Sequence, residues 1–361
     1  MREVAVVGYA HAPHVRSTDG TTNGVEMLVP VFQSLYDQLS ITKSDIGFWC
    51  SGSSDYLAGR AFSFISAIDS IGAVPPVNES HVEMDAAWAL YEAWVKIATG
   101  QVDTALVYGF GKSSAGPLPS ILALQTDPYV VAPLWPDSIS MAGLQARMGI
   151  DAGRWDDRAM ADVVADSRRQ AAQRPGAQLA GDDARGGSYS TDPDVLLAQP
   201  FINDPLRRHD CAPITDGAAA IVLAAGDRAR ELASTPAWIS GIEHRIDSAE
   251  IGGRDLLTSP STTASARSAS GGDLGFDLAE LHGPFSHQQI ILQEAIGLDS
   301  STIVNPSGGP LSGNPMFSAG LDRIGYAARP ILAGSAGRTL AHATAGPLLQ
   351  QNLVAVLEAR A

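Results

Sequence analysis

Apolar runs alternate with segments of helical spacing along the first third of the chain. The run Val4 to Gly8 is continuously apolar, as are strands buried on both faces of a parallel or mixed sheet. Further expected elements are a helix at 23–39, a strand at 46–50, a helix at 58–71, a strand at 73–77, a helix at 84–99 and a strand at 104–110. Strands that alternate with helices in this way predict an α/β protein.

The pattern loosens between about residues 113 and 210. This stretch carries prolines, a charged segment at 154–174 and a piece rich in glycine and aspartate at 176–194. We expect an inserted cap domain that is part helical and part loop. Insertions of this length are more often functional than idle.

The alternation returns after Asp210, where a turn leads into an apolar strand ending near Leu223. We expect a serine- and threonine-rich surface loop with some helix at 245–272. The other expected elements are strands at 238–243 and 278–281, a helix at 288–296, a strand at Ile303, a helix at 316–328 and closing strands near Leu340 and Val354. The chain thus divides into two α/β halves, 1–225 with the cap at about 113–210, and 226–361.

The composition is that of a globular protein with two domains of ordinary size. The chain has 361 residues, of which 45% are hydrophobic and 17% charged. A net charge of -15 argues against nucleic acid and against an anionic membrane surface as partners. The two cysteines make no disulfide framework, the N-terminus enters a strand without a secretory signal, and no apolar run has the length of a membrane span. We therefore expect a cytoplasmic protein without a membrane span.

A glycine-rich loop follows the strand at Ile303 and runs Asn305-Pro306-Ser307-Gly308-Gly309-Pro310-Leu311-Ser312-Gly313-Asn314-Pro315. Glycine permits backbone conformations closed to other residues, so Gly308, Gly309 and Gly313 are candidate ligand-binding positions. N–H groups at the start of the next helix suit an anion or a developing oxyanion. For such a loop taken alone, a tight strand-to-helix turn is the alternative.

This loop resembles the thiolase-superfamily motif N-P-x-G-G-x-x-x-x-G-H-P-x-G, with one residue fewer between Gly309 and Gly313. The sequence is similar to the sterol carrier protein x thiolases and to the bacterial lipid-transfer-protein branch, which is acetyl-CoA acetyltransferase-like and includes steroid side-chain aldolases. The resemblance implies a duplicated thiolase-like fold layered αβαβα. It places Asn314 where thiolases have a catalytic histidine. An amide donates the same hydrogen bond to a thioester oxygen but cannot shuttle a proton, and Asn314 also suits a helix cap.

Glu83 lies at a predicted strand-to-helix junction. In the resembled family this junction carries the nucleophilic cysteine, whose pKa the helix N-terminus lowers. Matching the segment Ala89-Leu90-Tyr91 to the family puts Glu83 at or near that position, and a slip of a residue or two puts His81 or Asp85 there. The alternative is that Glu83 and Asp85 are first-turn acids that favour the helix dipole.

His282 is the third candidate. The sterol carrier protein x thiolases have a His-Asp-Cys-Phe motif at this strand end, and His282 and Phe285 match it while the two residues between them do not. A neutral imidazole there suits a general acid or base. For His287 a surface or supporting role is expected.

His342 is the fourth candidate, because the sterol carrier branch has a histidine near this glycine-rich turn. A structural histidine is an equally open reading of His342. Cys211 matches a structural turn of that branch and is not expected to be a nucleophile.

With no cysteine at the junction, the resemblance points to retro-aldol cleavage of a 3-hydroxyacyl-CoA. This reaction needs a base, for which His282 or Glu83 qualifies, and hydrogen bonds to the enolate, from Asn314 and loop N–H groups. CoA enters as part of the substrate, no bound cofactor is expected, and the scattered histidines form no metal pattern. We expect Glu83, His282, Asn314 and His342 to meet in one cavity.

The resemblance further implies a steroid side chain as substrate. It also implies a dimer or a heteromer with a thiolase-like chain or a small OB-fold/zinc-ribbon protein. Two readings of a different class remain open: a non-catalytic subunit of a heteromeric thiolase-like complex, and an acyl-CoA- or lipid-binding protein.

Overall fold

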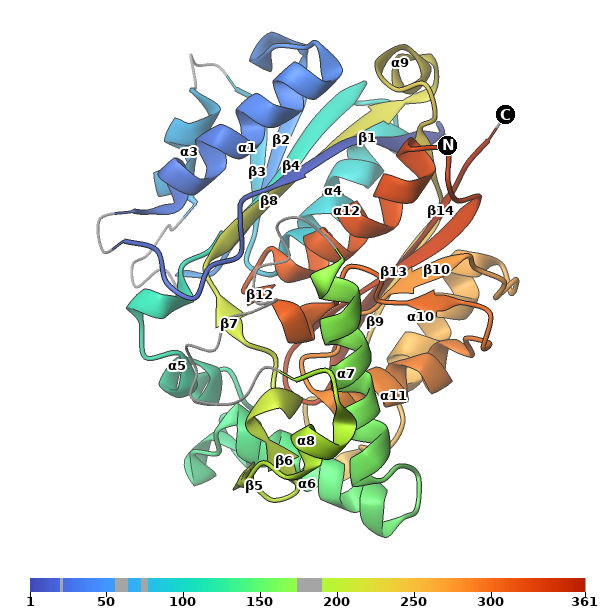
Figure 1. Cartoon of the computed structure of the whole chain (residues 1–361). Helices are drawn as coiled ribbons and strands as arrows, with labels where there is room; N and C mark the ends of the chain where they lie inside the picture. The colour runs from blue at the N-terminus through green and yellow to red at the C-terminus, as the bar shows by residue number, and fades with distance from the viewer. Residues whose placement is uncertain (20–21, 56–63, 73–76, 174–189, 361) are drawn as a thin grey trace.

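The computed structural model describes all residues except 20–21, 56–63, 73–76, 174–189 and 361 (Figure 1). Ten strands form one sheet in the order β11-β10-β13-β14-β9-β1-β8-β4-β2-β3. The strands of the first half are β1 (Val4–His11), β2 (Phe48–Gly52), β3 (Glu79–Val82), β4 (Thr104–Gly111) and β8 (Gly217–Ala225). Those of the second half are β9 (Ala237–Ile246), β10 (Leu278–Glu280), β11 (Ile303–Val304), β13 (Arg338–Ala345) and β14 (Gln351–Glu358).

The strand topology of the first half is repeated in the second. If the strands of each half are counted from first to fifth along the chain, both halves have the spatial order third, second, fourth, fifth, first. In both, the third and fourth strands pair parallel to the second, and the fifth pairs antiparallel to the fourth and the first. The halves join at β1 and β9, where Ala5 pairs with Trp238 and Val6 with Ala237. The predicted duplicated α/β architecture is therefore present, although no repeat was visible in the sequence.

Helices α4 (Ala86–Ala98) and α12 (Ala319–Leu332) lie side by side between the two five-stranded parts (Figure 1). Both are buried around most of their circumference, so apolar residues such as Leu90 and Ile324 join a single core. Helices α1 (Gly24–Leu39) and α3 (Ile65–Ile71) cover the outer face of the first half, and α10 (Pro260–Ser270) and α11 (Ser286–Ile296) that of the second. The layers are αβαβα, as expected for a thiolase-like fold.

Local sequence signals account for the element ends. Helix α1 is preceded by the cap residue Asn23, whose side chain accepts the Val25 N–H while Glu26 accepts the Asn23 N–H. It is followed by Ser40 in the left-handed conformation. A short helix, α9 (Gly226–Leu232), connects the halves. The chain ends meet where Arg360 donates to Glu3 at 2.6 Å.

The stretch expected to form a cap contains α5 (Leu118–Leu124), α6 (Ser138–Asp151), α7 (Asp157–Ala172), α8 (Pro193–Leu197) and the strand pair β5 (Phe201–Asn203) and β6 (Leu206–Arg207). In Figure 1 most of these elements lie at one end of the molecule, and α7 runs from there toward the centre. Strand β7 (Ile214–Thr215) pairs with β12 (Asn314–Pro315) and so brings the two halves together at the candidate loop. The domain limits drawn from the sequence remain a proposal.

Some expected elements differ from those observed. The helix expected at 316–328 begins at Ala319, since the preceding residues form β12 and a turn. The strand expected at 73–77 and the start of the helix at 58–71 fall largely outside the described residues. The segment 245–272 contains the partly buried helix α10, whose small side chains let it lie against β9, where a Cβ on Gly241 would be 2.0 Å from the Ala269 oxygen. In the part of the chain that the structure describes, no helix combines the length and apolarity needed to cross a bilayer.

Candidate functional site

The buried carboxylate of Asp85 ties the starts of α4 and α12 together. It accepts the N–H groups of Ala87 and Gly320 at 2.9 Å each and that of Leu321 at 3.1 Å. Burial raises the pKa of Asp85 to about 6, although these N–H groups favour the ionised form. Asp85 is therefore a cap shared by two helices, in line with its reading as a helix-stabilising acid.

Two glycines bring the strand ends into contact with these helix starts. A Cβ on Gly52 of β2 would lie 2.4 Å from the Ala86 nitrogen, and one on Gly109 of β4 would lie 2.3 Å from the Phe317 oxygen. The Ala86 N–H donates to that Phe317 oxygen at 2.9 Å. Two helix N-termini thus lie at the carboxyl ends of parallel strands, where ligands of α/β proteins bind.

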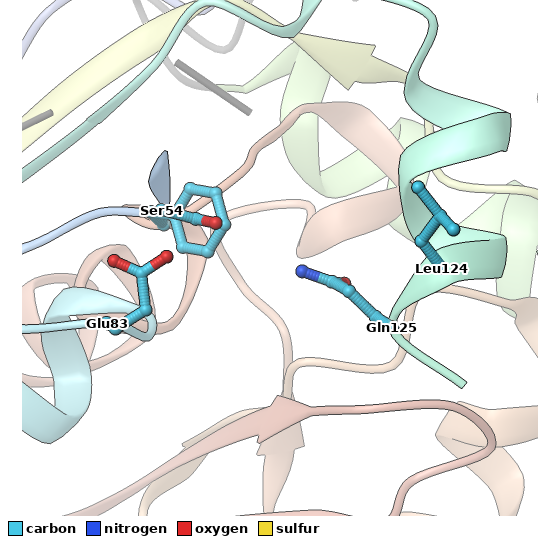
Figure 2. Close-up of a pocket in the computed structure, with 5 residues that line it drawn as sticks. Ser54, Glu83, Leu124 and Gln125 are labelled. Atoms are coloured by element: carbon cyan, nitrogen blue, oxygen red, sulfur yellow. The ribbon is translucent and has the colours of Figure 1, made fainter. Parts of the chain in front are cut away.

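A pocket of about 210 Å³ opens at this junction, between the β3–α4 turn and the end of α5. Its lining residues are Ser54, Glu83, Leu124, Gln125 and Phe317. Figure 2 shows Glu83 and Ser54 on one side and Leu124 and Gln125 on the other. The volume is below the roughly 300–1,000 Å³ of typical small-molecule sites, so it suits the reacting part of a substrate rather than a whole coenzyme.

Glu83 is the exposed end of a row of three polar side chains. Its carboxylate accepts the Asp55 N–H at 2.8 Å and lies 3.4 Å from His81 Nε2, and His81 Nδ1 lies 3.1 Å from Ser51 Oγ. Half of the Glu83 side chain is exposed, whereas Ser51 is 2% exposed. Glu83 can therefore meet a ligand in the pocket, while His81 and Ser51 support it from behind.

The other three candidates, His282, Asn314 and His342, form a buried hydrogen-bonded cluster. His282 Nε2 lies 3.0 Å from Asn314 Oδ1, and the His282 N–H donates to His342 Nδ1 at 3.4 Å. His282, Asn314 and His342 are 7%, 3% and 0% exposed. Strands β10, β12 and β13 or the residues next to them supply these side chains, so the fold joins positions far apart in the sequence.

The hydrogen bonds define what His282 can do. Its Nδ1 accepts the Thr344 N–H at 3.4 Å, so Nε2 carries the proton and donates to Asn314 Oδ1. Burial, together with the charge of Arg323 and the nearby His342, lowers the pKa of His282 to about 3, so the ring is neutral. His282 thus orients Asn314 with its amide oxygen toward the imidazole and its NH₂ group away from it. Both ring nitrogens of His282 are engaged within the protein, so these contacts favour a positioning role for it.

His342 uses both ring nitrogens inside the protein. Nδ1 accepts the His282 N–H, and Nε2 donates to Asn352 Oδ1 at 2.9 Å. Asn352 in turn donates to Ser261 Oγ at 2.7 Å and to the Leu349 oxygen at 2.8 Å. Burial lowers the pKa of His342 to about 4. Of the two roles open for His342, its contacts favour the structural one.

The glycine-rich loop directs its N–H groups inward. Those of Gly308, Gly309 and Gly313 donate to the Asn305 oxygen at 2.8 Å, to Ser307 Oγ at 3.1 Å and to the Pro310 oxygen at 3.2 Å. Gly308 and Gly309 have φ values of +91° and +61°, which a residue with a Cβ rarely adopts. The three glycines thus shape the loop, and their N–H groups are used by hydrogen bonds within it.

A buried ion pair and a buried histidine–carboxylate contact behind the loop were missed by the sequence reasoning. Arg323 donates to Glu280 at 2.8 Å and to Ser307 Oγ at 2.7 Å, and His14 Nε2 lies 3.0 Å from Asp322 Oδ2. The signal was the adjacent Asp322 and Arg323 in a helix that is otherwise apolar on nearly all sides. Arg323 ties α12 to Ser307 of the loop that carries Asn314, and His14 ties Asp322 of the same helix to the segment after β1.

Glu83 stands apart from the buried cluster. It lines the pocket together with Phe317, three residues after Asn314, but among the described residues no hydrogen bond joins Glu83 to His282, Asn314 or His342.

The remaining residues considered from the sequence do not line the pocket. Cys50 lies inside β2 and Cys211 beside Phe285, and burial raises the pKa of both thiols to about 12. His287 is fully buried rather than at the surface, with Nε2 3.0 Å from Gln145. Within the described ranges no three His, Cys, Asp or Glu residues are grouped to hold a metal ion.

Comparison with known proteins finds similarity to acyl-CoA enzymes. No protein-family model matches the chain. The chain is 26% identical over 371 aligned residues to the acetyl-CoA acetyltransferase of Methanothermobacter thermautotrophicus, covering 94% of this chain and 93% of that protein. It is also 26% identical over 158 residues to the acetyl-CoA acetyltransferase of Methanocaldococcus jannaschii, covering 36% and 40%. These similarities and the fold support a thiolase-like acyl-CoA enzyme family. The narrower sterol carrier or lipid-transfer branch stays a prediction.

Proposed function

We propose that this chain is a thiolase-like acyl-CoA enzyme that cleaves a C–C bond of a 3-hydroxyacyl-CoA by a retro-aldol reaction. The observation that carries the proposal is the half-exposed Glu83 carboxylate in the pocket at the start of α4. The resembled thiolases have a nucleophilic cysteine at this junction. A carboxylate at a pocket wall suits proton transfer, whereas Cys50 is buried, Cys211 is partly buried, and the pKa of both thiols is raised to about 12.

In the proposed reaction Glu83 takes the proton of the substrate's 3-hydroxyl group. The hydroxyl carbon becomes a carbonyl as the C2–C3 bond breaks, and the electron pair of that bond passes to the thioester as an enolate. C2 then takes the proton back from the Glu83 carboxylic acid. The products are an aldehyde or ketone and a shortened acyl-CoA, so the reaction needs no oxidant, reductant or second substrate.

Asn314 is the proposed donor to the enolate oxygen. His282 holds the Asn314 amide oxygen, so the NH₂ group is set in orientation before the substrate arrives. A donor fixed in a site from which water is largely excluded stabilises developing charge without reorganising. Asn314 is 3% exposed and does not line the pocket, so this role requires the loop that carries it to open toward the substrate.

The pocket volume limits the size of the part of the substrate that can enter it. About 210 Å³ matches the reacting end of an acyl group. A steroid side chain, as in the resembled aldolases, satisfies this limit, whereas a steroid ring system would remain outside. CoA takes part only as a portion of the substrate. The proposed protein acts in the cytoplasm. It acts as a dimer, or as a heteromer with a thiolase-like chain or a small OB-fold/zinc-ribbon protein.

The second candidate is a non-catalytic subunit of such a heteromer. The burial of His282 and Asn314, 7% and 3% exposed, favours it, because a substrate reaches them only if the protein opens. The third candidate, an acyl-CoA or lipid binder, shares the pocket but predicts no product.

The test incubates the chain, alone and with any copurifying partner, with 3-hydroxyacyl-CoA and 3-ketoacyl-CoA substrates and identifies products by mass spectrometry. We expect a shortened acyl-CoA and a carbonyl product from the hydroxy substrate. Glu83→Gln should lower the rate about 10²–10⁴-fold, as for loss of a general base. Glu231→Gln, at a surface side chain 63% exposed, is the matched control. Full activity of Glu83→Gln in an assembled complex of unchanged size favours the non-catalytic reading.

A further inference from the structure

Phe317 has a backbone conformation that is unfavourable for its residue type. Its φ is +67°, in the left-handed region where a Cβ meets the following carbonyl. Bulky residues stay in this region only where the surroundings determine the backbone, and such positions cluster at ligand sites.

The surroundings of Phe317 determine its backbone in this way. Its carbonyl oxygen accepts the Ala86 N–H at 2.9 Å and faces Gly109, where an added Cβ would lie 2.3 Å away. The preceding Met316 oxygen is equally close to a Cβ placed on Gly111. The strand glycines and the first turn of α4 therefore hold the backbone on one side, while the side chain lines the pocket on the other.

Phe317 is the aromatic residue in the pocket lining. Leu124 adds a second apolar side chain, and Ser54, Glu83 and Gln125 supply polar groups. The cavity has a volume of only about 210 Å³, so a phenyl ring in its wall is large relative to the space available for a ligand. Because Phe317 follows Asn314 by three residues, one loop carries both the proposed enolate donor and this ring.

We propose that Phe317 is a specificity-determining residue whose ring contacts the acyl group beyond the reacting carbons and limits its size. This inference rests on the proposed binding of a 3-hydroxyacyl-CoA at the Glu83 pocket, but it does not depend on the retro-aldol step. One methylene in a hydrophobic pocket changes discrimination about 10–200-fold, so removal of a whole ring has a measurable effect.

Two variants separate the ring from the backbone conformation. Phe317→Gly and Phe317→Ala both remove the ring, but only glycine is free of strain at φ +67°. If the ring limits size, both should shift the ratio of kcat/KM for a long over a short 3-hydroxyacyl-CoA upward by about tenfold or more. Phe317→Gly should also melt at a higher temperature than Phe317→Ala. Tyr129→Ala, at a cap side chain 88% exposed, should leave the ratio unchanged.

A binding measurement keeps the inference testable without turnover. In the Glu83→Gln background, calorimetry with the same two acyl-CoAs should show the same shift in the ratio of Kd values on loss of the ring. If the Kd ratio shifts while no variant turns substrate over, the size limit stands and the retro-aldol reaction fails. Unchanged ratios in both ring-less variants, a shift in Phe317→Gly alone, or no acyl-CoA binding by the wild-type chain would overturn the inference.

Discussion

Asn314→Asp tests the proposed division of labour within the buried cluster. The two side chains have nearly the same size, and a carboxylate oxygen still accepts the His282 Nε2–H that lies 3.0 Å from Asn314 Oδ1. The substitution replaces the NH₂ group, which His282 turns away from itself, by an oxygen. It therefore removes one donor and leaves the packing in place.

The magnitude follows from the donor that is lost. Removing one preorganised donor to an oxyanion lowers kcat about 10²–10³-fold, or roughly 2.7–4 kcal/mol. Asn314→Ala should show this loss. Asn314→Asp should lose more at a pH where its carboxyl group is ionised, because the carboxylate oxygen then repels the enolate. Stability should be affected differently: Asn314→Ala leaves the buried His282 donor unpaired, at about 1–3 kcal/mol, whereas Asn314→Asp keeps that bond.

The pH dependence adds an independent check. A carboxyl group placed in this buried cluster has its pKa raised by desolvation, so the folded state binds a proton more tightly than the unfolded state. The stability of Asn314→Asp relative to wild type should therefore be highest at low pH and fall as pH rises above about 4, the unfolded carboxyl value. Urea unfolding at pH 5 and pH 8, followed by steady-state kinetics at pH 7, measures both effects.

The reasoning fails on a specific result. If Asn314→Asp keeps wild-type kcat in a complex of unchanged size, then Asn314 donates no hydrogen bond that matters for the reaction. If its stability relative to wild type rises with pH, the hydrogen bond from His282 to the new carboxylate outweighs desolvation, and the expected rise of the carboxyl pKa is wrong.

Four further predictions concern other parts of the chain. Burial raises the pKa of the Cys50 and Cys211 thiols to about 12, so Cys50→Ala and Cys211→Ala should retain activity. Intact-mass spectrometry of the wild-type chain after exposure to acyl-CoA should likewise find no acyl adduct on a cysteine. An adduct on either cysteine would refute this. Burial lowers the pKa of His287 to about 3, whereas the unfolded histidine takes up a proton below about pH 6.5. As pH falls below that value, the wild type should therefore lose up to about 1.4 kcal/mol of unfolding free energy per pH unit relative to His287→Gln. Parallel pH profiles of urea unfolding for the two proteins would contradict this prediction. Arg323→Met removes the ion-pair partner of Glu280 in the core, leaving it only the hydrogen bonds from Ser307, and should lower the free energy of unfolding by about 3–5 kcal/mol, while the double change to Met at both positions should lower it less. Finally, light scattering should show an oligomer, and a stable, active monomer would rule out the expected assembly.

The apolar pattern alone was enough to predict most strands of the ten-stranded sheet and five of the helices, whereas α5 to α10 were not predicted as separate helices. Buried strands such as Val4–His11 read as continuous apolar runs because both faces are covered. Helix α4 was predicted to within two residues at its start because its length and composition leave few alternatives. The glycine-rich loop and the junction at Glu83 were also identified from the sequence and its resemblance to thiolases.

Only the tertiary structure decided what the candidate residues do. His282 is a donor because of which groups face its two nitrogens, and the partners Thr344 and Asn314 come from other strands. Asp85 caps a helix start 235 residues away, which no local pattern encodes. Sequence periodicity reports which face of an element is buried. The protonation, orientation and hydrogen-bond partners of a buried polar group depend instead on what the fold places opposite it.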